Sequence, residues 1–239
     1  MIIKHKKLLT LSEQIADQIR EAIINKDLNP GDKLPAEQEL ADQFQVSRPT
    51  IRDAIKILTA SKLIVTKSGA RGGHFVSEIN LSDLISDISD YITLSLSLEG
   101  MTIDEVVEVR ETVEIKSCSL AALRRTDADL KMLKEALPSI DVPLSGKQFF
   151  EQDLKFHQAV AQATHNRMVI ITIEAITLSL TPYFTHEDCP AQLRNELSLE
   201  LYDLYEAIEQ KNPELAEKRM IAHLSRFMDF LSVPVSHAN

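Results

Sequence analysis

The sequence contains no tryptophan, only two cysteines and six glycines, and aromatic residues make up 5% of its 239 residues. Cys118 and Cys189 cannot supply the disulfide framework of a small secreted protein, so we expect a reducing compartment, the cytoplasm. No run of 18 apolar residues occurs, which argues against a membrane-spanning helix. No apolar segment follows the basic Met1–Lys7, so we expect no signal peptide. Hydrophobic residues nevertheless reach 44%, enough for the cores of one large or two ordinary domains.

Positive charge is also scarce, but only in one part of the chain. The whole sequence has a formal net charge of −10, which is unfavourable for a nucleic-acid-binding protein. Residues 1–77 carry 12 Lys and Arg against 9 Asp and Glu, a net charge of +3, whereas residues 78–239 carry 14 against 27, a net charge of −13. This asymmetry predicts two domains with different partners, residues 1–77 and residues 78–239.

The N-terminal part is predicted to be a winged helix-turn-helix. Apolar residues recur at helical spacing in three segments, and two short apolar segments flank a glycine-rich turn. Ser47 is suited to cap the third helix, and Pro49 falls in its first turn, where its missing N–H costs little. This order of elements is typical of a winged helix-turn-helix. The expected helices cover residues 8–25, 36–44 and 48–61, and the expected strands cover 63–65 and 74–76.

The third of these helices has the composition of a DNA-reading helix. An arginine can donate two hydrogen bonds to a guanine edge, and Ser, Thr and the first N–H groups of a helix suit phosphate oxygens. Any one of these residues is equally well explained by an ordinary solvated surface, but the whole set in this order favours DNA binding. The candidates are Ser47, Arg48, Thr50, Arg52 and Lys56 on the helix and Lys67, Arg71 and His74 on the wing.

Residues 34–76 read LPxExELAxxFxVSRxTIRxAIxxLxxxxLIxxxxGxxGGxFV, where x is any residue. This pattern resembles the DNA-binding domain of the GntR family of bacterial transcription regulators, and the resemblance covers residues 8–78. Two positions depart from the usual pattern, because Ala36 replaces a capping Ser and Gln38 replaces an Arg. The resemblance implies DNA contacts from the starts of two helices and from the wing, at Glu37, Gln38, Ser47, Arg48, Pro49, Thr50, Arg52, Lys67, Gly69, Arg71 and Gly72.

From residue 81 onward the sequence shows helical periodicity and no strand signal. We expect Asp127 and Asn212 to cap two of the helices. The fold class is therefore mainly α, with an all-helical C-terminal domain of about seven helices that is large enough for a buried ligand cavity. The expected helices cover residues 81–98, 103–125, 127–138, 146–164, 167–184, 190–210 and 213–231.

Three residues of this helical part could hold a metal ion. Asp153 and His157 are four residues apart, which places both side chains on one face of a helix. His223 lies among apolar residues on the last expected helix. A lone histidine on a core face is more often a hydrogen-bonded structural residue, but together with Asp153 and His157 it predicts a site with nitrogen and oxygen ligands.

The helical part also carries Arg110-x3-Glu114-x6-Ala121-Ala122, Asp153-x3-His157, His165-Asn166, Ala207-Ile208 and Ala216-x3-Met220-x2-His223-Leu224. In this order, residues 81–231 resemble the FCD domain, the all-helical effector-binding domain of FadR-like GntR regulators. The resemblance implies a divalent metal ion, Zn²⁺ or Ni²⁺, held by Asp153, His157 and His223. It also implies a small organic or sugar acid as effector, with Arg110, His157 and His223 beside it.

Leu201 departs from the FCD pattern, because metal-binding members carry a histidine ligand at this position. Three protein ligands and an effector oxygen can still hold Zn²⁺. Alternatively, the metal has been lost and the effector is apolar. His165 and His186 could replace the missing ligand, but both fall at helix ends, where solvated histidines are expected. Arg110 could instead form only a weak surface ion pair with Glu114.

Together these observations predict a regulator of transcription and not an enzyme. We expect a homodimeric repressor, because a two-fold dimer of winged helices reads a palindromic operator. Effector binding in the helical domain would then lower the affinity for DNA. One alternative is a metal-dependent hydrolase with an accessory DNA-binding domain, but no general base or nucleophile motif accompanies the ligands. A nonspecific architectural DNA binder is a second alternative, which the acidic helical part disfavours.

Overall fold

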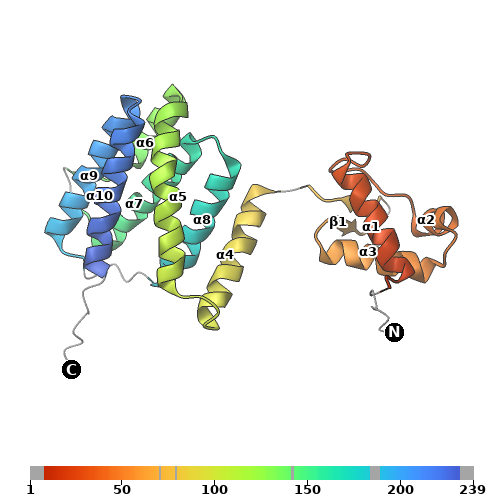
Figure 1. The fold of residues 1–239 in the computed structure, drawn as a ribbon. Coiled ribbons are helices and arrows are strands. Elements are labelled where there is room, and N and C mark those ends of the chain that lie inside the picture. Colours follow the sequence, from red (N-terminus) through yellow and green to blue (C-terminus); the bar gives the residue numbers. More distant parts are fainter. Residues whose placement is uncertain (1–7, 70, 79, 141–142, 184–188, 232–239) are drawn as a thin grey trace, which may run out of the picture. The chain divides into compact units, whose positions relative to one another are not determined.

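The computed structural model describes residues 8–69, 71–78, 80–140, 143–183 and 189–231. The chain divides into two compact units, Met1–Asn80 and Leu81–Asn239, which are described one at a time (Figure 1). Met1–Lys7 and His186, which entered the sequence predictions, lie outside the described residues. Across the described ranges, the helices lack the length and apolar character needed to cross a membrane.

The N-terminal unit is a winged helix-turn-helix, as predicted. Its two strands are antiparallel, with Ile64 opposite Val76 at one end and Lys67 opposite Gly73 at the other. The elements are α1 (Leu11–Ile24), α2 (Glu37–Phe44), α3 (Arg48–Ala60), β1 (Ile64–Lys67) and β2 (Gly73–Val76).

Local hydrogen bonds define the turn between α2 and α3. Ala36 offers no side-chain cap to α2, but the Glu39 carboxylate accepts a hydrogen bond from the Ala36 N–H at 2.8 Å, which keeps half of a capping box. The helix ends where Gln45 adopts a left-handed conformation with φ of 53°. Ser47 then caps α3, because its hydroxyl accepts a hydrogen bond from the Thr50 N–H. The predicted cap of α3 is confirmed.

One hydrophobic cluster joins these elements. Ile51, Ala54, Ile55 and Leu58 repeat at helical spacing and turn one face of α3 into the core. The opposite face of α3 stays in solvent, including the side chains of Arg48 and Arg52. The other buried members of the cluster are Ile15, Ala16, Ile19, Leu34, Leu40, Ala41, Ile64 and Val76.

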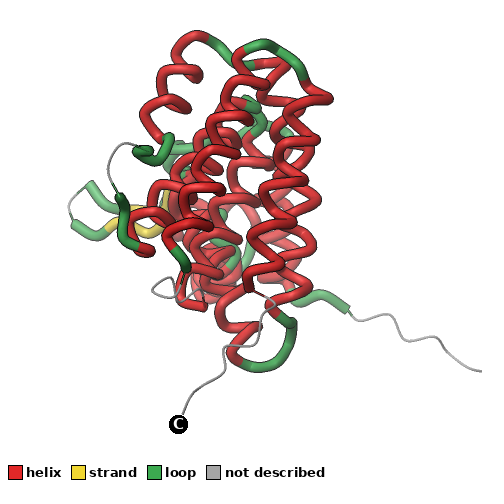
Figure 2. The backbone as a smooth tube through the Cα atoms, turned by 90° about the vertical axis from the view of Figure 1, so that its left-hand side faces the viewer, coloured by secondary structure: helices red, strands yellow, loops and turns green. Residues whose placement is uncertain are grey.

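The regular secondary structure of the C-terminal unit is helical wherever its residues are described, with loops between the helices (Figure 2). The seven predicted α-helices are confirmed, and a short 3₁₀ helix, Thr181–Tyr183, follows the fifth of them. The expected cap at Asp127 was wrong, because Thr126 makes the capping box and Asp127 is the first helical residue. The helices are α4 (Leu81–Ser97), α5 (Ile103–Arg124), α6 (Asp127–Ala136), α7 (Gly146–Ala163), α8 (Arg167–Leu180), α9 (Ala191–Glu209) and α10 (Pro213–Leu231).

Helix α5 is central to the packing of this unit. It packs against α10, α7, α8 and α9, while α4 packs against α8 (Figure 1). The largest core cluster joins α5, α7, α9 and α10, and it includes Phe156, Leu201, Leu204, Ile208 and Met220, none of which is exposed. Leu201, which stands at the expected position of a metal ligand, is therefore a core residue.

We predict that Leu201→Ala lowers the free energy of unfolding of the C-terminal unit by about 2–5 kcal/mol, because it removes buried methyl groups and leaves a cavity. Chemical denaturation of the full chain followed by circular dichroism measures this change. Leu199→Ala on the same helix is the control, because Leu199 is 54% exposed. Equal stability of the two variants would contradict the core position of Leu201.

Candidate functional sites

The exposed ends of α2, α3 and the wing meet at Glu37. Arg52 donates to both Glu37 oxygens, from Nε at 3.3 Å and from Nη2 at 2.9 Å, and Arg48 Nη2 donates to Oε2 at 3.3 Å. His74 Nε2 of the wing lies 3.9 Å from Oε1. The hydrogen bond from Arg52 lowers the pKa of Glu37. Glu37 therefore holds two half-exposed guanidinium groups together at the start of α3.

The other N-terminal candidates lie around this cluster. Gln38, which stands where an Arg is usual, donates a side-chain hydrogen bond to Asp42 on the same helix. Lys67 lies 5.0 Å above the ring of Phe75, a cation–π contact that places its charge on the wing. At Gly72, an added Cβ would come within 2.3 Å of the Lys67 carbonyl oxygen, so the tight wing turn requires glycine. Pro49, Arg71 and Gly69 lie on the exposed surface of α3 and the wing.

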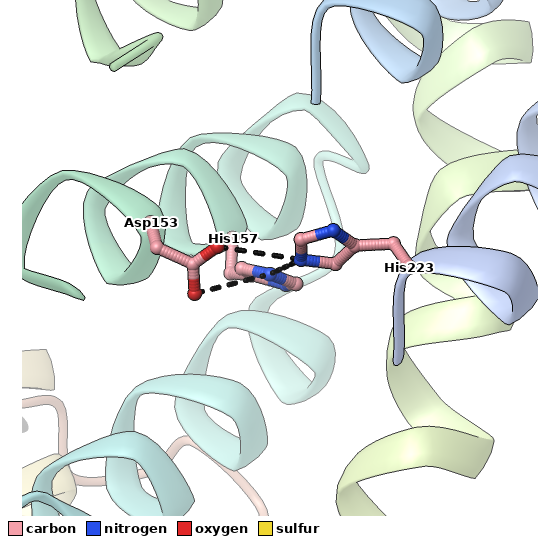
Figure 3. Close-up of side chains that lie close together, drawn as sticks. All are labelled: Asp153, His157 and His223. Atoms are coloured by element: carbon pink, nitrogen blue, oxygen red, sulfur yellow. Dashed lines mark hydrogen bonds and ion pairs between the residues drawn. The ribbon is translucent and has the colours of Figure 1, made fainter. Parts of the chain in front are cut away.

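The second candidate site is buried in the C-terminal unit. Asp153 and His157 project from α7, and His223 projects toward them from α10 (Figure 3). The two histidine Nε2 atoms are 3.3 Å apart, and Asp153 oxygens lie 3.3 Å from His223 Nε2 and 3.7 Å from His157 Nε2. At most 6% of each residue is exposed. The three candidate ligands predicted from sequence are thus brought together.

These side chains fit a metal ion in both geometry and chemistry. Two nitrogens and one oxygen form a donor set common to Zn²⁺ and similar ions. Tetrahedral ligands about 2.0–2.1 Å from Zn²⁺ are roughly 3.3 Å apart, close to the distances among Asp153, His157 and His223. Within the described ranges, these three residues form the one group that could hold a metal ion. Leu201 adds no ligand, and His165 instead pairs with Asp129, with Nε2 2.8 Å from Oδ2.

Arg110 and Glu114 extend the buried cluster. Arg110 Nε donates to Glu114 Oε1 at 2.9 Å, and Glu114 Oε2 lies 2.9 Å from His157 Nδ1. The alternative of a weak surface ion pair was wrong, because Arg110 is 5% exposed and Glu114 is 1% exposed. The sequence could not predict this burial, because the i, i+4 spacing of Arg110 and Glu114 is the same on a buried and on an exposed helix face. Burial raises the pKa of Glu114, but Arg110 and His157 outweigh this effect and bring the pKa to about 2.

Glu200 and Arg226 belong to the same site and were not identified from the sequence. Glu200 Oε2 lies 3.4 Å from His223 Nδ1, and Arg226 donates to Glu200 from the next helix. Burial lowers the pKa of His223, but Asp153 and Glu200 raise it to about 9. The surrounding carboxylates therefore stabilise a positive charge at His223, which a proton or a metal ion can supply. No local sequence signal marks Glu200, because its role depends on the packing of α9 against α10.

The comparisons with known proteins cover both units. The model of "Bacterial regulatory proteins, gntR family" matches residues 11–76, and that of the FCD domain matches residues 105–226. The HTH-type transcriptional regulator LutR of Bacillus subtilis (strain 168) is 32% identical over 216 residues, which are 88% of this chain and 96% of that protein. The putative L-lactate dehydrogenase operon regulatory protein of Escherichia coli (strain K12) is 29% identical, over 90% of this chain and 84% of that protein.

Two further matches complete this picture. The galactonate operon transcriptional repressor of Escherichia coli (strain K12) is 26% identical, over 91% of this chain and 95% of that protein. Among solved structures, Streptococcus agalactiae GntR matches with a TM-score of 0.59 and 23% identity, over 92% of this chain and 99% of that chain, which supports the fold.

We predict that Glu114→Ala lowers the free energy of unfolding by about 3–5 kcal/mol, because it leaves the Arg110 guanidinium buried without its counter-charge. Glu108→Ala, at an exposed position of the same helix, is the control and removes the same charge. Chemical denaturation of both proteins in the presence of a chelator makes the comparison. A loss no larger than that of the control would mean that Glu114 does not compensate Arg110.

Proposed function

This chain belongs to the gntR family of bacterial regulatory proteins and carries an FCD domain, and on this basis we propose that it is a repressor whose operator affinity is controlled by a small hydroxy acid. Like its relatives, the chain is a transcriptional regulator and not an enzyme. The repressor action, the homodimer and the hydroxy acid are parts of the proposal. The observation that carries it is the buried cluster of Asp153, His157, His223 and Arg110.

DNA binding is assigned to the start of α3, the start of α2 and the wing. Arg48 and Arg52 are the proposed base-reading residues, because their guanidinium groups are exposed and held together by Glu37. The hydroxyl groups of Ser47 and Thr50, at the start of α3, suit phosphate oxygens. One winged helix contacts only a few base pairs, so a homodimer on a palindromic operator is the proposed binding form.

The effector site is assigned to the buried cluster of the C-terminal unit. Asp153, His157 and His223 would hold one Zn²⁺ or Ni²⁺ ion, which supplies a Lewis acid with open positions for carboxylate and hydroxyl oxygens. Arg110 donates a hydrogen bond from Nε to Glu114, and its guanidinium makes no other hydrogen bond to the described residues. Its remaining N–H groups can therefore donate to an effector carboxylate.

A hydroxy acid is the proposed effector class for two reasons. Its adjacent carboxylate and hydroxyl oxygens match a cationic site with nearby N–H donors. The names of two relatives refer to an L-lactate dehydrogenase operon and to galactonate, and both lactate and galactonate are hydroxy acids. Effector binding would change the contacts between α5, α7 and α10, and a change of operator affinity requires that the effector prefers one of two arrangements.

We predict that Arg52→Ala weakens binding to an operator selected from random-sequence DNA by at least about tenfold, because one guanidinium fork to a base edge is lost. Gel-shift titration at fixed salt measures the dissociation constant. Arg20→Ala on α1 removes the same charge from the same unit and should bind almost as wild type. Undiminished affinity of the Arg52 variant would remove α3 from the DNA interface.

We predict about one Zn²⁺ or Ni²⁺ per chain in the purified, untagged protein, since three buried ligands suffice for one ion. Plasma emission spectrometry before and after dialysis against a chelator measures this content. Asp153→Ala and His223→Ala should lose the ion, while His165→Ala should keep it. Small hydroxy acids should then release DNA only from the metal-loaded protein. A folded wild-type protein without metal would disprove this part of the proposal and leave the DNA-binding assignment unchanged.

A further inference from the structure

Polar atoms without well-directed hydrogen bonds are concentrated around the buried cluster. In the part of the chain that the structure describes, eight buried side-chain nitrogen and oxygen atoms are of this kind. Five of them belong to the cluster and its neighbours, namely Glu114 Oε2, Asp153 Oδ1, His157 Nδ1, Glu200 Oε2 and His223 Nδ1. Buried polar atoms in native proteins nearly always have partners. An ion bound at the two Nε2 atoms and at Asp153 would fix the orientation of both rings. Each Nδ1 could then donate a well-directed hydrogen bond to its glutamate.

Glu114 links His157 to Arg110. Arg110 Nε donates to Glu114 Oε1 at 2.9 Å, and Glu114 Oε2 lies 2.9 Å from His157 Nδ1. The Glu114 carboxylate thus divides its two oxygens between an arginine and a histidine. All three side chains are at least nine-tenths buried.

The contacts of His223 repeat this order on the other side of the cluster. Arg226 Nε donates to Glu200 Oε1 at 2.6 Å, and Glu200 Oε2 lies 3.4 Å from His223 Nδ1. This second series reaches solvent, because the Arg226 side chain is 47% exposed and that of Glu200 is 19% exposed. Both series end at an imidazole whose Nε2 faces Nε2 of the other imidazole, at 3.3 Å.

We propose that Glu114 and Glu200 are positioning residues that hold the ring hydrogen of each histidine on Nδ1 and direct both Nε2 lone pairs at one metal ion. This inference rests on the metal site of the proposed function. A carboxylate beside Nδ1 favours the tautomer protonated there, and it fixes the ring orientation and raises the basicity of Nε2. Arg110 and Arg226 in turn hold the two carboxylates in place.

Helix α9 therefore serves the site without supplying a ligand. Leu201 packs in the core, whereas Glu200, its neighbour in sequence, acts on the metal through His223. Because Glu200 is partly exposed, its replacement disturbs the core less than replacement of Glu114. Glu200 is therefore the residue at which the inference is best tested.

The experiment compares Glu200→Gln with Glu196→Gln. Glu196 lies one turn earlier on α9 and pairs with the same Arg226, at 2.9 Å from Nη1, but has no described contact with His223. The variants are titrated with Co²⁺ and Zn²⁺ in competition with a chromophoric chelator. Glu200→Gln should weaken metal binding by about 10- to 100-fold and alter the visible absorption of bound Co²⁺. Glu196→Gln should leave both unchanged.

The thermal stability of both variants in chelator, read beside the Co²⁺ spectrum, separates positioning from a merely structural role. We expect the metal-free Glu200→Gln protein to melt below the Glu196→Gln protein, because Glu200 also stabilises a protonated His223, whereas the altered spectrum of bound Co²⁺ reports the positioning role, which a merely structural role would not change. Wild-type affinity and an unchanged Co²⁺ spectrum in Glu200→Gln would overturn the inference while the metal site stands. A wild-type protein that binds neither ion would overturn the metal site and the inference together.

Discussion

The compensation of buried charge is the constraint on which the C-terminal unit depends. Glu114, Asp153 and His223 have almost no solvent contact, and a single unpaired charge in such surroundings is costly. Among the described residues, Arg110 carries the one buried guanidinium. The charges are balanced only while α5, α7, α9 and α10 hold their side chains within a few ångströms of each other. An ion or acid that enters this cluster changes the balance and acts on four helices together.

A different balance of charge organises the proposed DNA-binding face. Glu37 is an acidic residue in the region proposed to approach phosphates, and it accepts hydrogen bonds from both Arg48 and Arg52. The carboxylate offsets part of the positive charge but holds two flexible side chains in one place. Less conformational entropy is then lost when a guanidinium meets a base edge, because the side chain is already ordered. Glu37 thus lowers the net positive charge of this face but orders the two arginine side chains that would read the bases.

The sequence predicted most of the fold and four of the seven residues of the buried cluster. Helices were predictable because their periodicity and breaks are local. Asp153 and His157 were predictable as neighbours because they lie four positions apart on one helix. The surface interpretation of Arg110 and Glu114 was wrong because local spacing carries no information about burial. Glu200 was not found, since its contact with His223 exists only after α9 and α10 have packed.

The two Arg–Glu–His series also restrict how this protein can change over generations. Replacement of Glu114 alone leaves the charge of Arg110 buried without a partner, and replacement of Arg110 alone leaves the charge of Glu114 without its arginine partner. A single substitution at either position is therefore costly, whereas replacement of both residues together leaves no unpaired charge. Residues outside the charged network carry no such restriction. Substitutions at the apolar positions around the network leave these charges paired, so the proposed site can change shape there without the cost of an unpaired buried charge.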